Sequence, residues 1–262
     1  MTAPELSLAE GLTVAYRARF DECGPDGLAR TSVLLRYAQD MAWIHSELAG
    51  FDRDWYAARG LGWVVRAAEL SYLRGVPLGT TLQVTTRVVG VRKVWARRRT
   101  EARLPDGSLA VWGHTDWVIT DERGMPARIP PEFHGRFAFE VASFEPGRVP
   151  LPPTPADAVV LRSLVRPQDI DPMAHVNNAA YVDYLEEALL AVGDAGAAVI
   201  AALPRTVRIE YLYPASPQSL VDGAVWPEPL GDRPGWAWRL TDADGRDLAH
   251  ARVGEGAEPP PR

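Results

Sequence analysis

The chain repeats one order of elements twice, and this repetition constrains its fold more than any other feature. In each half a short alternating segment is followed by a turn, one long helix and four segments with strand periodicity. When Tyr37 is aligned with Tyr184, the turn at 24–28 falls on the turn at 171–175, and the two helices come into register. A helix followed by a run of strands is typical of the α+β class. The sequence therefore predicts two copies of one α+β unit.

In the first half we expect a helix over residues 32–49, because apolar residues recur there at steps of three and four. Thr31 is the expected N-cap, and Gly50 the expected stop. Alternating apolar and polar residues with turn-forming residues between them predict strands at 14–20, 63–73, 80–91, 94–104 and 109–120.

The second half follows the same pattern, with a helix expected over 175–192 and strands at 159–165, 206–213, 220–227, 236–241 and 247–253. Proline is frequent between the halves, which predicts an extended connector that belongs to neither sheet. We therefore expect an N-terminal unit over 1–125, a connector over 126–158 and a C-terminal unit over 159–262.

Composition excludes several classes of protein. The longest apolar run, 197–203, has seven residues, whereas a helix needs roughly 20 to span a bilayer. The only cysteine, Cys23, cannot form an intrachain disulfide, and the formal net charge of −6 provides no basic surface for nucleic acid. The polar residues at 1–5 do not resemble a signal peptide. We expect a cytoplasmic protein with no nucleic-acid or membrane partner, no cofactor and no bound metal.

One segment, 169–181, brings together side chains that support chemistry. Asp171, His175, Asn177 and Asn178 lie together at the expected start of the second helix. The first N–H groups of a helix lack internal partners and carry partial positive charge, so they can bind an oxyanion. A carboxylate beside them can activate water or attack a carbonyl, and a histidine can donate to the same oxygen.

A purely structural interpretation also fits this segment, because Asp is a common N-cap. Two observations favour chemistry. The matching turn of the first half has Gly24 and Leu28 in place of Asp171 and His175, so the turn itself does not require them. Two adjacent asparagines within a first helical turn are also unfavourable, by a few tenths of a kcal/mol each.

The motif D-x-D-P-x-x-H-V-N-N-x-x-Y, at 169–181, resembles that of hotdog-fold thioesterases. The doubled layout, with Y-R-A-R-F at 16–20 and Gln39-Asp40 in the first helix, is similar to acyl-ACP thioesterases. The resemblance implies α+β tandem hotdog folds, each a long antiparallel sheet wrapped around a central helix, packed as a pseudo-dimer. It also implies that the acyl chain binds in the N-terminal unit and that the catalytic residues lie in the C-terminal unit.

Under this resemblance Asp171 matches the catalytic aspartate, also that of 4-hydroxybenzoyl-CoA-type thioesterases, and His175 matches the family histidine. Two positions depart from the acyl-ACP enzymes. Met173 stands where they usually have Asn, and Pro214 where they have Glu. Neither side chain can polarise water, which favours hydrolysis led by Asp171.

The sequence thus predicts an acyl thioesterase acting on an acyl-ACP or acyl-CoA thioester, as a monomer or a homodimer. The alternatives are a hotdog hydratase or dehydratase and a non-catalytic acyl-binding protein. A basic run over 92–99 is a candidate surface for an acyl carrier protein or for the phosphates of coenzyme A, or else a solvated strand face. Its candidate contact residues are Arg92, Lys93, Arg97 and Arg99.

Overall fold

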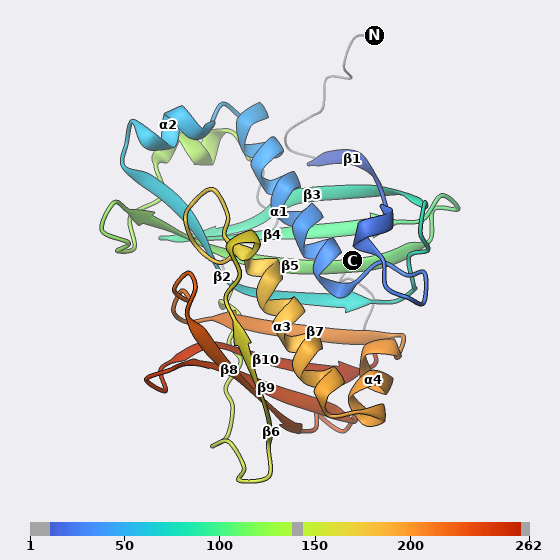
Figure 1. Cartoon of the computed structure of the whole chain (residues 1–262). Coiled ribbons are helices and arrows are strands. Elements are labelled where there is room, and N and C mark those ends of the chain that lie inside the picture. The colour runs from blue at the N-terminus through green and yellow to red at the C-terminus, as the bar shows by residue number, and fades with distance from the viewer. Residues whose placement is uncertain (1–10, 138–143, 258–262) are drawn as a thin grey trace.

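The computed structural model describes residues 11–137 and 144–257, which contain one antiparallel sheet of ten strands (Figure 1). The strand order is β1-β3-β4-β5-β2-β7-β10-β9-β8-β6. The first half supplies β1 (Leu12–Arg17), β2 (Leu61–Tyr72), β3 (Thr81–Arg92), β4 (Trp95–Arg103) and β5 (Leu109–Asp121). The second supplies β6 (Val159–Leu164), β7 (Arg205–Tyr211), β8 (Leu220–Pro227), β9 (Gly235–Asp242) and β10 (Asp247–Glu255). The opening residues 1–5 lie outside the described residues.

Two long helices, α1 (Thr31–Leu48) and α3 (Asn178–Ala191), lie side by side on one face of this sheet and contact each other (Figure 1). We call this the helix face. Two shorter helices, α2 (Arg53–Ala57) and α4 (Asp194–Ala201), follow them and were not predicted. None of the helices in the described ranges is long and apolar enough to cross a membrane.

The two halves join where β2 pairs with β7. In this antiparallel pairing Ala68 faces Ile209 and Leu70 faces Val207. By sequence similarity between these strands, Leu70 is equivalent to Ile209 and Ala68 is equivalent to Val207. Ala68 therefore faces the equivalent of Leu70, and Leu70 faces the equivalent of Ala68. This reciprocity is the signature of a local two-fold axis, as in an isologous dimer interface. The repeated halves therefore build one continuous sheet.

From residue 144 onward the proline-rich segment crosses the face of the sheet opposite the helices, which we call the connector face. Its earlier part, with Phe133 and Phe137, packs against Phe51 on the helix side. The backbone N–H groups at Gly147 and Val149 donate to the buried carboxylates of Asp116 (2.7 Å) and Glu210 (2.8 Å). Asp116 belongs to β5 of the first half and Glu210 to β7 of the second. The connector therefore satisfies two buried carboxylates while it passes from one half to the other.

Both helix starts differ from the sequence prediction. The second helix begins at Asn178, not at His175, and Asn177 is its N-cap, whose Oδ1 accepts the Ala179 N–H at 3.0 Å. Asparagine is favourable at an N-cap, and only Asn178 lies inside the first turn, so the expected cost of two asparagines there is wrong. Thr31 is the first residue of α1 and not its N-cap; its hydroxyl donates to Glu186 of α3 instead.

Candidate active site

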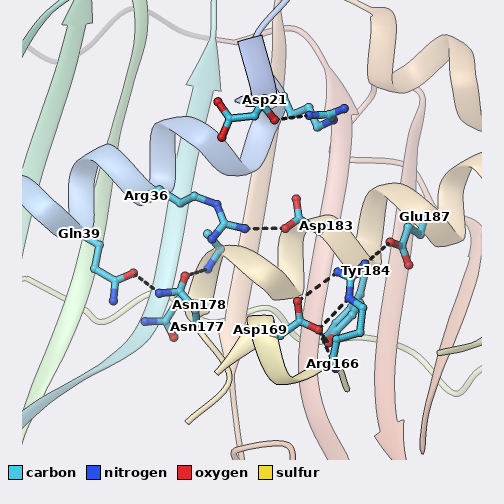
Figure 2. Close-up of polar contacts among 12 residues, drawn as sticks. Asp21, Arg36, Gln39, Arg166, Asp169, Asn177, Asn178, Asp183, Tyr184 and Glu187 are labelled. Carbon is cyan, nitrogen blue, oxygen red and sulfur yellow. Dashed lines mark hydrogen bonds and ion pairs between the residues drawn. The ribbon is translucent and has the colours of Figure 1, made fainter. Parts of the chain in front are cut away.

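A buried carboxylate anchors the chain just before the candidate loop. Asp169 Oδ2 accepts hydrogen bonds from the Arg166 N–H (2.9 Å) and the Tyr184 hydroxyl (2.6 Å), and its two oxygens also accept from the Arg166 guanidinium. Burial raises the pKa of Asp169, but the bonds from Arg166 and Tyr184 together outweigh burial and hold this pKa below its usual value. Figure 2 shows the group at the start of α3.

The first half contains the same anchor, 147 residues earlier. Glu22 accepts from the Arg19 N–H (2.9 Å), from the Arg19 guanidinium (2.7 Å) and from the Tyr37 hydroxyl (2.6 Å). Burial again raises the carboxyl pKa, and the bonds from Tyr37 and Arg19 lower it further than burial raises it. Because the half without the motif has this anchor too, we assign Asp169 a structural role.

The loop that follows also has the same backbone in both halves. The Asp171 N–H donates to His175 O at 2.8 Å, as the Gly24 N–H donates to Leu28 O at 2.8 Å. Three residues after the first residue of each loop the backbone is left-handed: Ala174 has φ 59° and Gly27 has φ 76°. The loop is thus a conserved feature of the repeat, and the side chains on it differ.

The carboxylate of Asp171 is half-buried and held by its own loop. Its Oδ1 accepts the Met173 N–H at 2.8 Å and, more weakly, the His175 N–H at 3.4 Å. No hydrogen bond within the described residues reaches its Oδ2. The imidazole of His175 is exposed beside it. The loop therefore orients one carboxylate oxygen and leaves the other for a substrate or water.

The segment after β7 lies against the same helix start. The Ala215 N–H donates to the Tyr181 hydroxyl at 3.0 Å, which places Pro214 next to α3. Burial raises the pKa of Tyr181, and the negative charge of Asp171 raises it further, so Tyr181 lies within electrostatic reach of that carboxylate. The structure thus places Pro214 next to α3, and it places Met173 in hydrogen-bond contact with Asp171.

Residues of the first half complete this site. Asn177 Nδ2 donates to Gln39 Oε1 of α1 at 3.2 Å, and Arg36 of α1 forms an ion pair with Asp183 of α3 at 2.7 Å (Figure 2). From the sequence, Gln39 is part of the family resemblance alone and is not expected at the site. The only signal for it is its position on the apolar-periodic helix, which does not reveal a partner 138 residues away.

The basic run lies elsewhere. Arg97 forms two hydrogen bonds with Asp116 (2.6 and 2.7 Å), Arg99 pairs with Glu101 (2.8 Å) and Arg92 with Glu145 (2.8 Å). The side chains of Arg97 and Arg99 are only 22% and 9% exposed. Lys93 is exposed at the turn between β3 and β4. In this arrangement Arg97 and Arg99 are committed to contacts within the chain.

Two family models match the sequence. The acyl-ACP thioesterase N-terminal domain matches residues 11–137, and the thioesterase-like superfamily matches residues 165–205, which include the candidate loop. The acyl-ACP thioesterase model thus covers just under half of the chain, and over these residues the chain is similar to that family. A curated relative, the chloroplastic acyl-[acyl-carrier-protein] hydrolase FATB2 of Cuphea viscosissima, is 24% identical over 191 residues, covering 66% of this chain. The chain spans 45% of that relative's length, just under half.

Solved structures of acyl-ACP thioesterases share the fold. The 12:0-ACP thioesterase from Umbellularia californica matches with a TM-score of 0.76 at 22% identity, over 93% of this chain and 96% of that one. A Lactobacillus plantarum protein described as an oleoyl thioesterase matches with a TM-score of 0.81 at 20% identity, over 95% of this chain and 97% of that one. These matches confirm the predicted α+β tandem hotdog fold.

Proposed function

We propose that this chain is a member of the acyl-ACP thioesterase family and that it hydrolyses an acyl thioester of acyl carrier protein or coenzyme A to the free acid and the thiol. The observation that carries the proposal is the placement of Asp171. Its loop fixes Oδ1 and leaves Oδ2 without a partner among the described residues, beside the first turn of α3. The matching loop of the first half has glycine at this position and closes with the same backbone hydrogen bonds, so the fold does not require a carboxylate there.

The start of α3 supplies the oxyanion site. Asn177 accepts the Ala179 N–H with its side chain and the Ala180 N–H with its backbone oxygen. The next donor toward the loop is the Asn178 N–H, which as the first residue of the helix has no internal partner. A thioester oxygen bound there gains the partial positive charge of the helix end as negative charge develops on it.

In the reaction Asp171 Oδ2 takes a proton from water while the water oxygen adds to the thioester carbon. The tetrahedral intermediate then collapses, the C–S bond breaks, and the leaving sulfur takes up a proton to give the thiol. His175 donates a hydrogen bond to the carbonyl oxygen or the water. Asn177 and Asn178 keep the helix start in place, the former through Gln39. Attack by Asp171 itself, through an anhydride, uses the same geometry.

The remaining expectations extend this proposal. We propose that the acyl chain lies in the N-terminal unit, that units 1–125 and 159–262 flank the connector, and that the enzyme acts in the cytoplasm. Arg92 and Lys93 are the members of the basic run that remain accessible to an acidic carrier. The matched family models describe thioesterases and so do not favour the hydratase or the non-catalytic alternative.

The decisive experiment is a thiol-release assay with acyl-ACP and acyl-CoA substrates of several chain lengths. We expect release from at least one carrier by the wild-type protein and its loss in Asp171→Asn. Undiminished release by Asp171→Asn would remove Asp171 from the mechanism. Hydration of an enoyl thioester without thiol release would favour the hydratase instead.

A further inference from the structure

The interior of the first half contains a layer of polar side chains between α1 and the sheet. His45 of α1 and Thr86 of β3 are 0% exposed, and Arg98 and Thr100 of β4 are each 8% exposed. This polar layer separates two groups of apolar side chains, one around Met41, Leu82 and Val84 and the other around Phe51, Phe133 and Phe137. Buried polar groups are expensive unless they are paired, so the burial of Arg98 and Thr86 calls for a reason.

The second half shows that the fold does not require such a layer. The strand registers pair Ala68, Thr115, Arg98 and Val88 across one row of the first half. They pair Val207, Val253, Trp236 and Pro227 across the matching row of the second. These rows make Trp236 the counterpart of Arg98. The next row along the strands makes Trp238 the counterpart of Thr100 and Val225 the counterpart of Thr86. The alignment of the two long helices makes Val192 the counterpart of His45. None of them is charged, and the only polar side-chain atoms among these four residues are the Nε1 atoms of the two tryptophans.

Arg98 is the least compensated member of the layer. One of its guanidinium nitrogens lies 3.0 Å from His45 Nδ1, and the group lies 5.8 Å from the ring centre of Phe137. No carboxylate within residues 11–137 and 144–257 pairs with it. Burial lowers its pKa to about 10. The hydroxyl of Thr86, on the neighbouring strand, is buried without a hydrogen-bond partner in the described part of the chain.

We propose that this layer binds a carboxylate at the distal end of the acyl chain, so that the substrate is the monothioester of a dicarboxylic acid. The proposal rests on the proposed function and names its substrate class. A guanidinium binds a carboxylate through paired, charge-assisted hydrogen bonds, which a hydrocarbon end cannot form. The Thr86 hydroxyl can donate to the same group. The acid would supply the negative charge that the described residues do not provide.

The length of the acyl chain follows from α1. Gln39 contacts the catalytic loop through Asn177, and His45 in the polar layer lies six residues further along the same helix. At about 1.5 Å per residue this separation is about 9 Å. An extended chain advances roughly 1.2 Å per bond, so about seven bonds span it. The favoured substrate is therefore a medium-chain acid of roughly eight carbons.

The test compares pantetheine thioesters of octanedioic acid, of its monomethyl ester and of octanoic acid. Their binding to the Asp171→Asn variant is measured by calorimetry, and thiol release by the wild-type protein is measured in parallel. We expect the free-carboxylate thioester to bind tenfold to a hundredfold more tightly than the other two, and the same order in kcat/KM. Equal or weaker binding of the free-carboxylate thioester would overturn the proposal.

Substitutions locate the effect. Adding Arg98→Met should abolish the preference, and adding Thr86→Val, which is nearly isosteric, should reduce it about threefold to tenfold. Arg103→Met, on the same strand with a half-exposed side chain paired to Glu101, should leave the preference unchanged. If Arg98→Met does not fold, the Thr86→Val result decides. A preference that survives in every folded variant overturns the proposal.

The two proposals fail differently. Thiol release without preference among the three thioesters contradicts the polar-layer proposal and leaves the thioesterase proposal standing. A binding preference that depends on Arg98, without thiol release from any thioester, supports the polar layer and contradicts the thioesterase proposal.

Discussion

The loops at 24–28 and 171–175 have the same backbone hydrogen bonds and follow the same arginine–carboxylate–tyrosine anchor. The two loops differ in the side chains at their first and last positions. The first has Gly24 and Leu28, and the second has Asp171 and His175. The first loop folds with no histidine and with its acid, Asp26, at the third position and not the first. The repeat therefore supplies a scaffold, and in the proposed mechanism the second copy adds the reactive groups to it. In this proposal the anchors belong to the scaffold and the loop side chains to the chemistry.

The largest expected effect is on the catalytic rate, after substitution in the second loop. Asp171→Asn should lower kcat roughly a thousandfold, because the amide can neither accept the proton of water nor attack the carbonyl. The melting temperature should change little, since the amide oxygen still accepts the loop N–H groups. Steady-state thiol release and thermal unfolding measure the two effects. The matched control is Asp26→Asn in the first loop, and a similar loss of activity there would contradict the division of roles.

A smaller effect is expected at the histidine. His175→Leu makes the second loop resemble the first, in which Leu28 occupies the matching position. We expect a tenfold to hundredfold lower kcat, because a neutral apolar side chain cannot hydrogen-bond the oxygen or the water. The exposed position predicts an unchanged unfolding midpoint. Full activity in His175→Leu would restrict the chemistry to Asp171 and the helix start.

Substitution of the two anchor carboxylates, Glu22 and Asp169, should lower stability to a similar extent, because both have a structural role. Glu22→Gln and Asp169→Asn should each lower the free energy of unfolding by about 1–3 kcal/mol, because each weakens charge-assisted hydrogen bonds to a buried group. Denaturant titration of both variants measures this. If only Asp169→Asn lowers kcat while stability is equal, Asp169 has a role beyond the anchor.

These anchors also predict a pH dependence. The pKa values of Glu22 and Asp169 are lowered in the folded protein, so the native state favours their ionised forms. Their contribution to stability is fully present above the unfolded pKa values, about 4.3 and 3.9, and is lost as pH falls through the lower folded values. The wild-type protein should therefore lose stability below about pH 4, and each variant should show a shallower loss. Acid titration followed by circular dichroism tests this.

The smallest effect concerns the left-handed residue in each loop. Ala174→Gly should raise the free energy of unfolding, because glycine adopts positive φ without the cost borne by a Cβ atom. Gly27→Ala should lower it, and each change should be about 1 kcal/mol. Thermal unfolding of both variants measures the pair. A change of the same sign in both would mean that the two loops do not share one backbone.

The sequence alone determined the repeat, the α+β class and nearly all the strands. The predicted strand at 220–227 coincides with β8, and the other long strands agree within about two residues. These features follow from local periodicity, since alternating side chains specify strands and steps of three and four specify helices. The sequence also found the loop that carries Asp171, because its polar residues are adjacent along the chain.

Only the tertiary structure decided which residues, distant in sequence, contact this loop and the start of α3. Asn177 became an N-cap because its N–H bonds to Asp169 O, and Ile170 bridges to Val176, which holds the preceding residues out of the helix. Gln39 reached the site and Arg98 was buried against His45 through contacts between segments far apart in sequence. Such contacts leave no period in the sequence, because they depend on how the sheet twists and where the helices cross it.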